Sequence, residues 1–278
     1  MDRREFLARS ACLMAGSLFG LSGISKAFAI EKDNTLTGFS PPRVALIIDD
    51  IGFSETHARQ FLSLNTPITF SILPRLERSQ DLAFEIHEHG HEIMLHQPME
   101  PYNPDLDPGP GALYSGFSGD EITGIMEENI RAIPFAVGMN NHMGSKFTEC
   151  KKEVGDALGV VNRTGLFFVD SLTTNHSMAY RTAKKLHMAA SYRDRFLDNI
   201  PDEKVIYFQL NNLIKYAITY GHAIGIGHPY TETAKAIGRS LGNFEKLGVS
   251  LVYVSKVLTL RNSAIEKGVS TSGSHDFT

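Results

Sequence analysis

The sequence predicts an α/β fold built on a parallel sheet, either open or closed into a barrel. Short apolar runs alternate with longer stretches whose apolar residues recur at helical spacing. The first run, 44–48, is continuously apolar, as strands buried on both faces of a parallel sheet are. Alternating strands and helices require crossover connections, which are right-handed and leave the strands parallel.

Each element follows from a local signal. Helices are expected where amphipathic stretches are framed by caps, for example from Ser54 and up to Gly90. The segment Pro101–Gly119 carries four Pro and four Gly, and is either a functional rim or lid over a site or a surface excursion. Expected strands are 44–48, 68–73, 92–95, 136–139, 166–169, 188–190, 223–226 and 250–254, and expected helices are 54–64, 79–89, 120–133, 149–162, 178–187, 202–220 and 232–247.

The first 29 residues are interpreted as a signal peptide of the twin-arginine type. Arg3-Arg4 precedes a mild apolar run, and Ala27-Phe28-Ala29 resembles a cleavage site. That run, of about 14 residues, is short of the roughly 20 that a spanning helix needs. An uncleaved membrane anchor is the alternative. We therefore expect an exported protein, periplasmic or extracellular, with no stable membrane span after cleavage.

The remaining chain is expected to form one domain with two tails. Residues 30–42 form a polar lead, residues 43–258 the domain, and residues 259–278 a tail whose Ser, Thr and Gly content predicts disorder. No linker-like change in composition divides residues 43–258, so we expect a single domain there. The oligomeric state is not indicated.

Charge and cysteine content exclude several classes of function. Lys and Arg number 27 against 31 Asp and Glu, a net charge of −4, so no basic excess suggests nucleic-acid binding. Two cysteines are too few for a disulfide scaffold or a cysteine-ligated metal. Cleavage would remove Cys12 and leave Cys150 alone. Any metal would have to be bound by Asp and His.

Polar residues follow nearly every expected strand at its carboxyl end. In a parallel barrel these ends converge on one face, where active sites lie. Several His and Asp without Cys suggest a site of nitrogen and oxygen ligands, and two His with one carboxylate is typical of catalytic Zn²⁺, although another divalent ion is possible. The residues are Asp49, Asp50, His96, Asn140, Asn141, His142, Asp170, Arg193, Asp194 and His228.

Six strings resemble the divergent branch of the polysaccharide deacetylases. They occur in order between about Arg43 and Leu258, which is nearly the whole expected mature chain. The strings are ALIIDDIGFS, GHEIMLHQPMEP, GMNNHMGS, VDS, RDRFLDN and AIGIGHPYTET.

The resemblance implies a deformed (β/α) barrel of about seven to eight parallel strands. It also implies a metal-dependent hydrolase of non-peptide carbon–nitrogen bonds, which removes acetyl groups, expected to be N-acetyl, from an envelope or extracellular carbohydrate. Carried over by position, Asp49 is the catalytic base, and Asp50 and His96 are metal ligands. His228 matches the histidine that protonates the leaving group.

Two departures from the mainstream family affect the site. Glu100 stands where the mainstream enzymes have a second ligand histidine, and Asn-Asn-His-Met-Gly replaces an Arg-x-Pro string. We infer that His142 replaces the missing ligand, with Glu100 as the competing assignment. The same departures motivate an alternative function, an inactive deacetylase-like module that binds a glycan or an envelope protein.

For most of the other polar residues the sequence leaves two roles open. Asn140 and Asn141 either support His142 or contact substrate, and Asp170 has a possible supporting role. Arg193 and Asp194 either form a buried ion pair or orient a catalytic group. His228 is either catalytic or structural. His87, His89 and His91 are close in sequence, but His87 and His89 face different ways on the expected helix, so solvated or structural roles are expected for all three. No chemistry is assigned to His57, His187 and His222.

Overall fold

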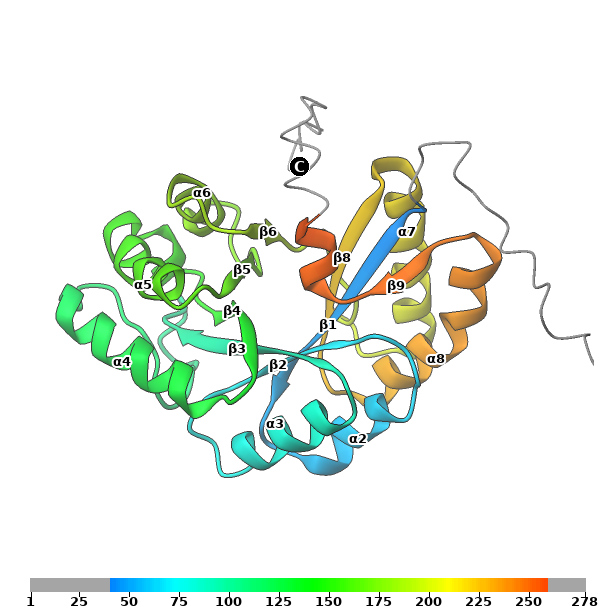
Figure 1. The fold of residues 1–278 in the computed structure, drawn as a ribbon, viewed down its shortest axis with the longest axis horizontal. Coiled ribbons are helices and arrows are strands. Elements are labelled where there is room, and N and C mark those ends of the chain that lie inside the picture. The colour runs from blue at the N-terminus through cyan, green and yellow to red at the C-terminus, as the bar shows by residue number, and fades with distance from the viewer. Residues whose placement is uncertain (1–40, 260–278) are drawn as a thin grey trace, which may run out of the picture. The chain divides into compact units, whose positions relative to one another are not determined.

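The computed structural model describes residues 41–259, which form one sheet of nine parallel strands surrounded by helices (Figure 1). The strands are β1 (Arg43–Ile51), β2 (Thr69–Ile72), β3 (Glu92–Met99), β4 (Ala136–Met143), β5 (Phe167–Asp170), β6 (Ala190–Tyr192), β7 (Arg195–Phe196), β8 (His222–Gly227) and β9 (Ser250–Val252). The helices are α2 (Glu55–Leu62), α3 (Ser79–Glu88), α4 (Gly119–Ala132), α5 (Lys151–Arg163), α6 (Ala179–Lys185), α7 (Glu203–Tyr220) and α8 (Thr231–Lys246).

The sheet has the order β6-β5-β4-β3-β2-β1-β8-β7, and β9 pairs with β1. Its two ends belong to one continuous segment, because β6 runs into β7 through Arg193 and Asp194. The amide of Arg193 donates to the carbonyl of Asp170, and that of Asp194 donates to the carbonyl of Ile224. One stretch of backbone therefore joins β5 to β8, which confirms the expected deformed (β/α) barrel.

All eight expected strands and all seven expected helices are present among the described residues, with boundaries moved by a few residues. The additional strand is β7, which has only two residues. A segment so short carries no apolar periodicity, and its place is set by pairing with β8 at Arg195 and Phe196.

The core has two parts, one inside the barrel and one between the barrel and its helices. The interior cluster combines strand residues such as Ala45, Ile47 and Ile226 with Val254 and Leu258 from the last helical turn. The larger cluster packs the outward faces of the strands against α2 to α8. Because both faces of the strands are covered, β1 is apolar without alternation.

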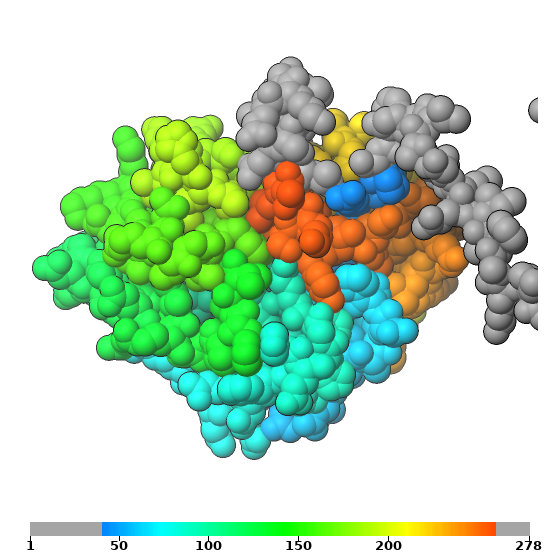
Figure 2. Space-filling view, in the orientation of Figure 1, coloured from blue at the N-terminus to red at the C-terminus, as the bar shows by residue number. Residues whose placement is uncertain are grey.

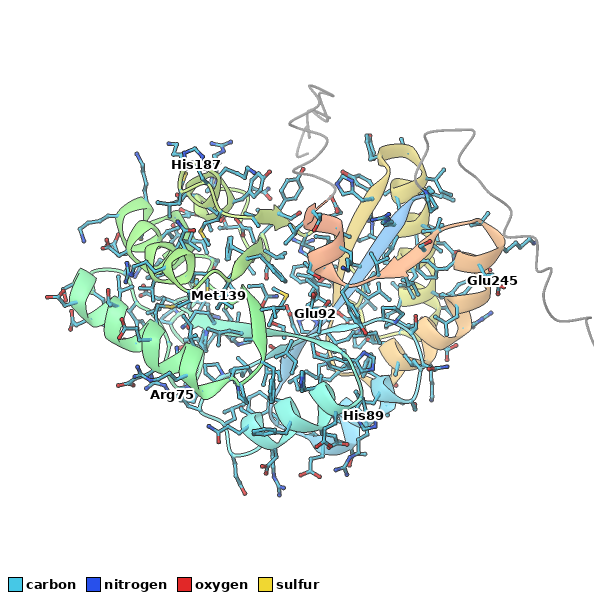
Figure 3. All side chains as sticks on the ribbon, viewed as in Figure 1. Arg75, His89, Glu92, Met139, His187 and Glu245 are labelled. Carbon is cyan, nitrogen blue, oxygen red and sulfur yellow. The ribbon has the colours of Figure 1, made fainter. Side chains whose placement is uncertain are left out.

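The segment after β9 covers the amino-terminal end of the barrel. The amide of Ser255 donates to Glu92 Oε1 at 3.2 Å, and that of Val254 donates to Thr69 Oγ1 at 3.2 Å. This orange-red segment fills the middle of the face seen in Figure 2. Glu92 lies near the centre of the same view, whereas Arg75, His187 and Glu245 lie at its periphery (Figure 3).

The long loop after β3 is attached to the opposite end of the barrel. Leu113 forms a bridge with Met99, and the amide of Glu100 donates to the carbonyl of Leu113 at 2.9 Å. Within residues 41–259, no helix has the length and apolar content needed to cross a membrane. The expected signal peptide, nearly all of the polar lead and nearly all of the expected disordered tail lie outside these residues.

Candidate metal centre and active site

Two adjacent aspartates at the end of β1 have different environments. Asp49 is 2% exposed, whereas the side chain of Asp50 is 27% exposed. Asp50 has φ 56°, a left-handed conformation that Asp tolerates better than most residues, and the β1–β2 register shifts between Ile48 and Ile51. Both carboxylates approach His96 Nε2, with Asp50 Oδ1 at 3.1 Å and Asp49 Oδ2 at 3.7 Å.

Three side chains, from β1, β3 and β4, bring one potential ligand atom each to a common point. Asp50 Oδ1 from β1 lies 3.1 Å from His96 Nε2 of β3 and 2.8 Å from His142 Nδ1 of β4. The two ring nitrogens are 3.2 Å apart. Parallel pairing explains the approach, because Pro98 of β3 is opposite His142 and His96 is two residues earlier on the same strand.

This triangle fits a divalent metal ion. Asp50 Oδ1 is buried, yet neither nearby ring directs a hydrogen at it with hydrogen-bonding geometry. A tetrahedral ion with bonds of 2.0 to 2.1 Å has ligand atoms roughly 3.3 Å apart, close to the observed separations. Two imidazole nitrogens and a carboxylate oxygen suit Zn²⁺ or a similar ion.

Electrostatics keep Asp50 ionised. Burial raises the pKa of Asp50, but the imidazoles of His142 and His96 outweigh burial and hold that pKa well below its usual range. A carboxylate that stays ionised across the ordinary pH range is always available as a ligand.

Asn140 connects the candidate ligand His96 to the carboxylate of Asp49. Its Oδ1 lies 2.7 Å from His96 Nδ1, and its Nδ2 donates to Asp49 Oδ1 at 2.8 Å. The hydroxyl of Ser71 also donates to Asn140 Oδ1. Because Oδ1 only accepts hydrogen bonds, His96 carries its hydrogen on Nδ1 and leaves Nε2 with a free lone pair facing the triangle.

Asp49 lies beside the ligand triangle without being part of it. Its Oδ2 is 3.7 Å from His96 Nε2. Burial raises the pKa of Asp49 above its ordinary value, although the nearby His96 and His228 act in the opposite direction. A buried carboxylate with a raised pKa next to a ligand set is suited to accept a proton.

His228, the residue after β8, faces the triangle and forms a hydrogen bond with Asp198. His228 Nε2 is 4.0 Å from Asp50 Oδ2, and its Nδ1 lies 2.8 Å from Asp198 Oδ1. Asp198 Oδ2 accepts the backbone amide of His228 at 2.6 Å and the hydroxyl of Thr233 at 2.7 Å. A Cβ at Gly227 would lie 3.1 Å from Asp198 Oδ2, so glycine there admits the carboxylate.

This pairing favours the imidazolium form of His228. Burial lowers the pKa of His228, but the hydrogen bond and charge of Asp198, with smaller contributions from Asp49 and Asp50, raise it to about 9. His228 is therefore charged near neutral pH and can donate a proton from Nε2.

Glu100 does not join the ligand group. Its Oε1 pairs with Lys146 Nζ at 2.7 Å, and its Oε2 accepts the amide and hydroxyl of Ser115. Glu100 therefore attaches the loop after β3 to the residues after β4, and the geometry favours His142 over Glu100 as the third ligand.

Four other predicted site residues form hydrogen bonds with the loops and strand ends around the site. Asn141 bridges the carbonyl of Met143 and the amide of Ser171. Asp170 accepts three hydrogen bonds within its own loop, from Leu172, Ser177 and Tyr180. The guanidinium of Arg193 donates to the carbonyls of Ser171 and Leu172, and Asp194 accepts the amide of Ile224.

The sequence interpretation omitted two residues that shape the site. Asp198 lies in the string RDRFLDN but was not singled out, and Ser71 lies inside a buried strand without any signal. The signal that could have identified Asp198 is its membership of the same string as Arg193 and Asp194.

Comparisons with known proteins agree with this fold. A family model described as divergent polysaccharide deacetylase matches residues 46–258. The uncharacterized protein YibQ of Escherichia coli K12 is 32% identical over 217 residues, 78% of this chain and 67% of that protein. An uncharacterized protein of Haemophilus influenzae Rd is 28% identical over 209 residues, 75% of this chain and 74% of that protein.

A solved structure extends the likeness to three dimensions. The crystal structure of the uncharacterized protein ATU2773 from Agrobacterium tumefaciens C58 has a TM-score of 0.75 and 25% sequence identity. The match covers 80% of this chain and 91% of that chain. With a family match over most of its length, the chain belongs to the divergent polysaccharide deacetylase family.

Proposed function

We propose that this protein is a metal-dependent hydrolase that removes N-acetyl groups from an envelope or extracellular carbohydrate. The observation that carries the proposal is the convergence of Asp50, His96 and His142, with Asp49 and His228 beside them. Family membership supports the deacetylase-like fold and the reaction class.

The residues divide the reaction between them. A divalent ion, expected to be Zn²⁺, would supply polarisation of the acetyl carbonyl and activation of water when bound by the triangle. Asp49 accepts the proton of the attacking water. His228 gives its Nε2 proton to the leaving amine as the carbon–nitrogen bond breaks, so that the products are acetate and a free amine.

The test is acetate release. Purified protein loaded with Zn²⁺ is incubated with N-acetylated and O-acetylated glycans, with and without a chelator. Acetate from an N-acetylated glycan, lost with the chelator and restored by metal, is the expected result. Absence of acetate from every glycan despite full metal occupancy would contradict the proposal and favour an inactive binding module.

Export is a separate proposal. Residues 1–29 are proposed to direct the protein out of the cytosol through the twin-arginine route, where it would meet an envelope glycan. Replacing Arg3 and Arg4 by Lys and following the tagged protein by cell fractionation tests it. Export that continues unchanged would contradict this route.

A further inference from the structure

A groove leads away from the candidate metal centre between the β1–α2 turn and the β8–α8 turn. It shares Asp50 and His228 with the centre, so whatever occupies the groove lies next to the reacting group. The other lining residues come from the two turns, the end of β1 and the start of α2, and are Ile51, Phe53, Ser54, His57, Pro229 and Tyr230.

Two aromatic side chains line this groove while remaining open to solvent. Phe53 is 70% exposed and Tyr230 is 44% exposed. The Tyr230 ring lies 5.9 Å from the His228 ring, so it extends the wall that begins at the proposed proton donor. Phe53 belongs to the opposite turn, which carries Asp50.

The backbone is restrained near both aromatic residues. A Cβ at Gly52 would lie 2.9 Å from Leu76 Cδ1, and Gly52 has φ 136°, so the turn before Phe53 packs closely and requires glycine. The amide of Tyr230 donates to the carbonyl of His228 at 2.7 Å. A restrained backbone limits the conformational freedom that the two turns lose when a ligand binds, which favours affinity.

We propose that this groove is a sugar-binding subsite, in which Phe53 and Tyr230 contact the apolar face of a pyranose ring next to the acetylated residue. This inference rests on the proposed function and specifies its substrate as an oligomeric glycan chain. A pyranose has apolar C–H faces and a hydroxyl edge, which match aromatic walls and a few polar groups. Ser54 and His57 supply those polar groups in the groove.

The experiment measures binding separately from turnover. Chitooligosaccharide is titrated into metal-loaded Asp49→Asn protein by calorimetry, because loss of the base prevents hydrolysis during the measurement. Phe53→Ala and Tyr230→Ala are added to this background, and Phe208→Ala serves as the control because Phe208 is 60% exposed on α7 and does not line the groove.

Phe53→Ala and Tyr230→Ala are each expected to weaken binding about tenfold, a loss of about 1.4 kcal/mol. Metal content should be unchanged, Phe208→Ala should bind normally, and Tyr230→Phe should retain most of the affinity because it keeps the ring. Failure of the Asp49→Asn protein to bind chitooligosaccharide overturns the subsite. Binding by both alanine variants that is as tight as binding by the Asp49→Asn parent also overturns it.

The outcome is distinguishable from that of the proposed function. Binding that depends on both rings, together with no acetate release by the protein with native Asp49, leaves the subsite standing and overturns the hydrolase. Acetate release, together with an affinity that neither Phe53→Ala nor Tyr230→Ala lowers, overturns the subsite and leaves the hydrolase standing.

Discussion

Asp198 makes contact with both the backbone and the ring of His228. Its Oδ1 lies 2.8 Å from His228 Nδ1, and its Oδ2 accepts the amide of the same residue at 2.6 Å. The side chain of Asp198 is fully buried. One carboxylate therefore sets the orientation of the imidazole, its tautomer and its charge.

Asp198→Asn is expected to move the alkaline limb of the activity profile to lower pH. His228 must be protonated to act as an acid, and its pKa of about 9 keeps it so through neutral pH. Without the carboxylate charge, burial remains and lowers that pKa, so activity should fall at a lower pH. The measurement is kcat against pH. Asp202→Asn, which alters the cap of α7, should leave the limb in place.

The same pair predicts a pH-dependent stability in metal-free protein. Because the folded pKa of His228 is raised from 6.5 to about 9, the pair stabilises the fold fully below pH 6.5 and progressively less as pH rises through about 9. At ~1.4 kcal/mol per pKa unit, the pH-dependent part is roughly 3 kcal/mol. Urea unfolding in a chelator should show the wild-type advantage over Asp198→Asn shrinking towards about pH 10. An advantage that grows with pH would contradict this sign.

Asn140 and Asn141 form a matched pair for testing support of the ligands. Both are buried on β4, but only Asn140 contacts His96 and Asp49. Asn140→Leu should weaken Zn²⁺ binding roughly 10- to 100-fold, because His96 loses the acceptor that orients it. Asn141→Leu should lower stability while metal affinity stays near wild type. Competition with a chromogenic chelator measures both, and equal losses would refute a specific role for Asn140.

The site was predictable where topology alone brings residues together. Asp49, Asp50, His96, His142 and His228 each follow an apolar run, and parallel pairing gathers strand ends on one face whatever the loop details. Asp170 and Asn141 satisfy the same rule, yet their hydrogen bonds go to the rim. Position at a strand end therefore identifies the face but does not separate catalytic from structural residues.

Residues that act through loop geometry were not predictable. Asp198 follows β7, whose two residues have no periodicity, and it reaches His228 only because β7 pairs with β8 beside Gly227. The choice between Glu100 and His142 likewise depended on where side chains lie. Lys146 and Ser115 engage Glu100, and neither contact is visible in the spacing of residues.

Asp49→Asn is expected to retain metal and lose turnover. Asn keeps the oxygen that accepts from Asn140 but cannot take a proton from water, so kcat should fall roughly 100-fold or more. Asp170→Asn is the matched control, since Asp170 is equally buried at a strand end and its carboxylate accepts hydrogen bonds from Leu172, Ser177 and Tyr180. It should lower stability and leave turnover per bound metal near wild type. Full activity in Asp49→Asn would remove Asp49 from the role of base.

The third ligand is tested by comparing His142→Ala with Glu100→Gln. His142 Nδ1 lies 2.8 Å from Asp50 Oδ1, so its removal should leave two protein ligands and reduce bound Zn²⁺ well below one equivalent after dialysis. Glu100→Gln should keep native metal content, because its carboxylate is engaged by Lys146 and Ser115. Its expected effect is instead faster proteolysis of residues 101–118, which lose their ion-paired anchor. Metal loss in Glu100→Gln with full retention in His142→Ala would reverse the assignment.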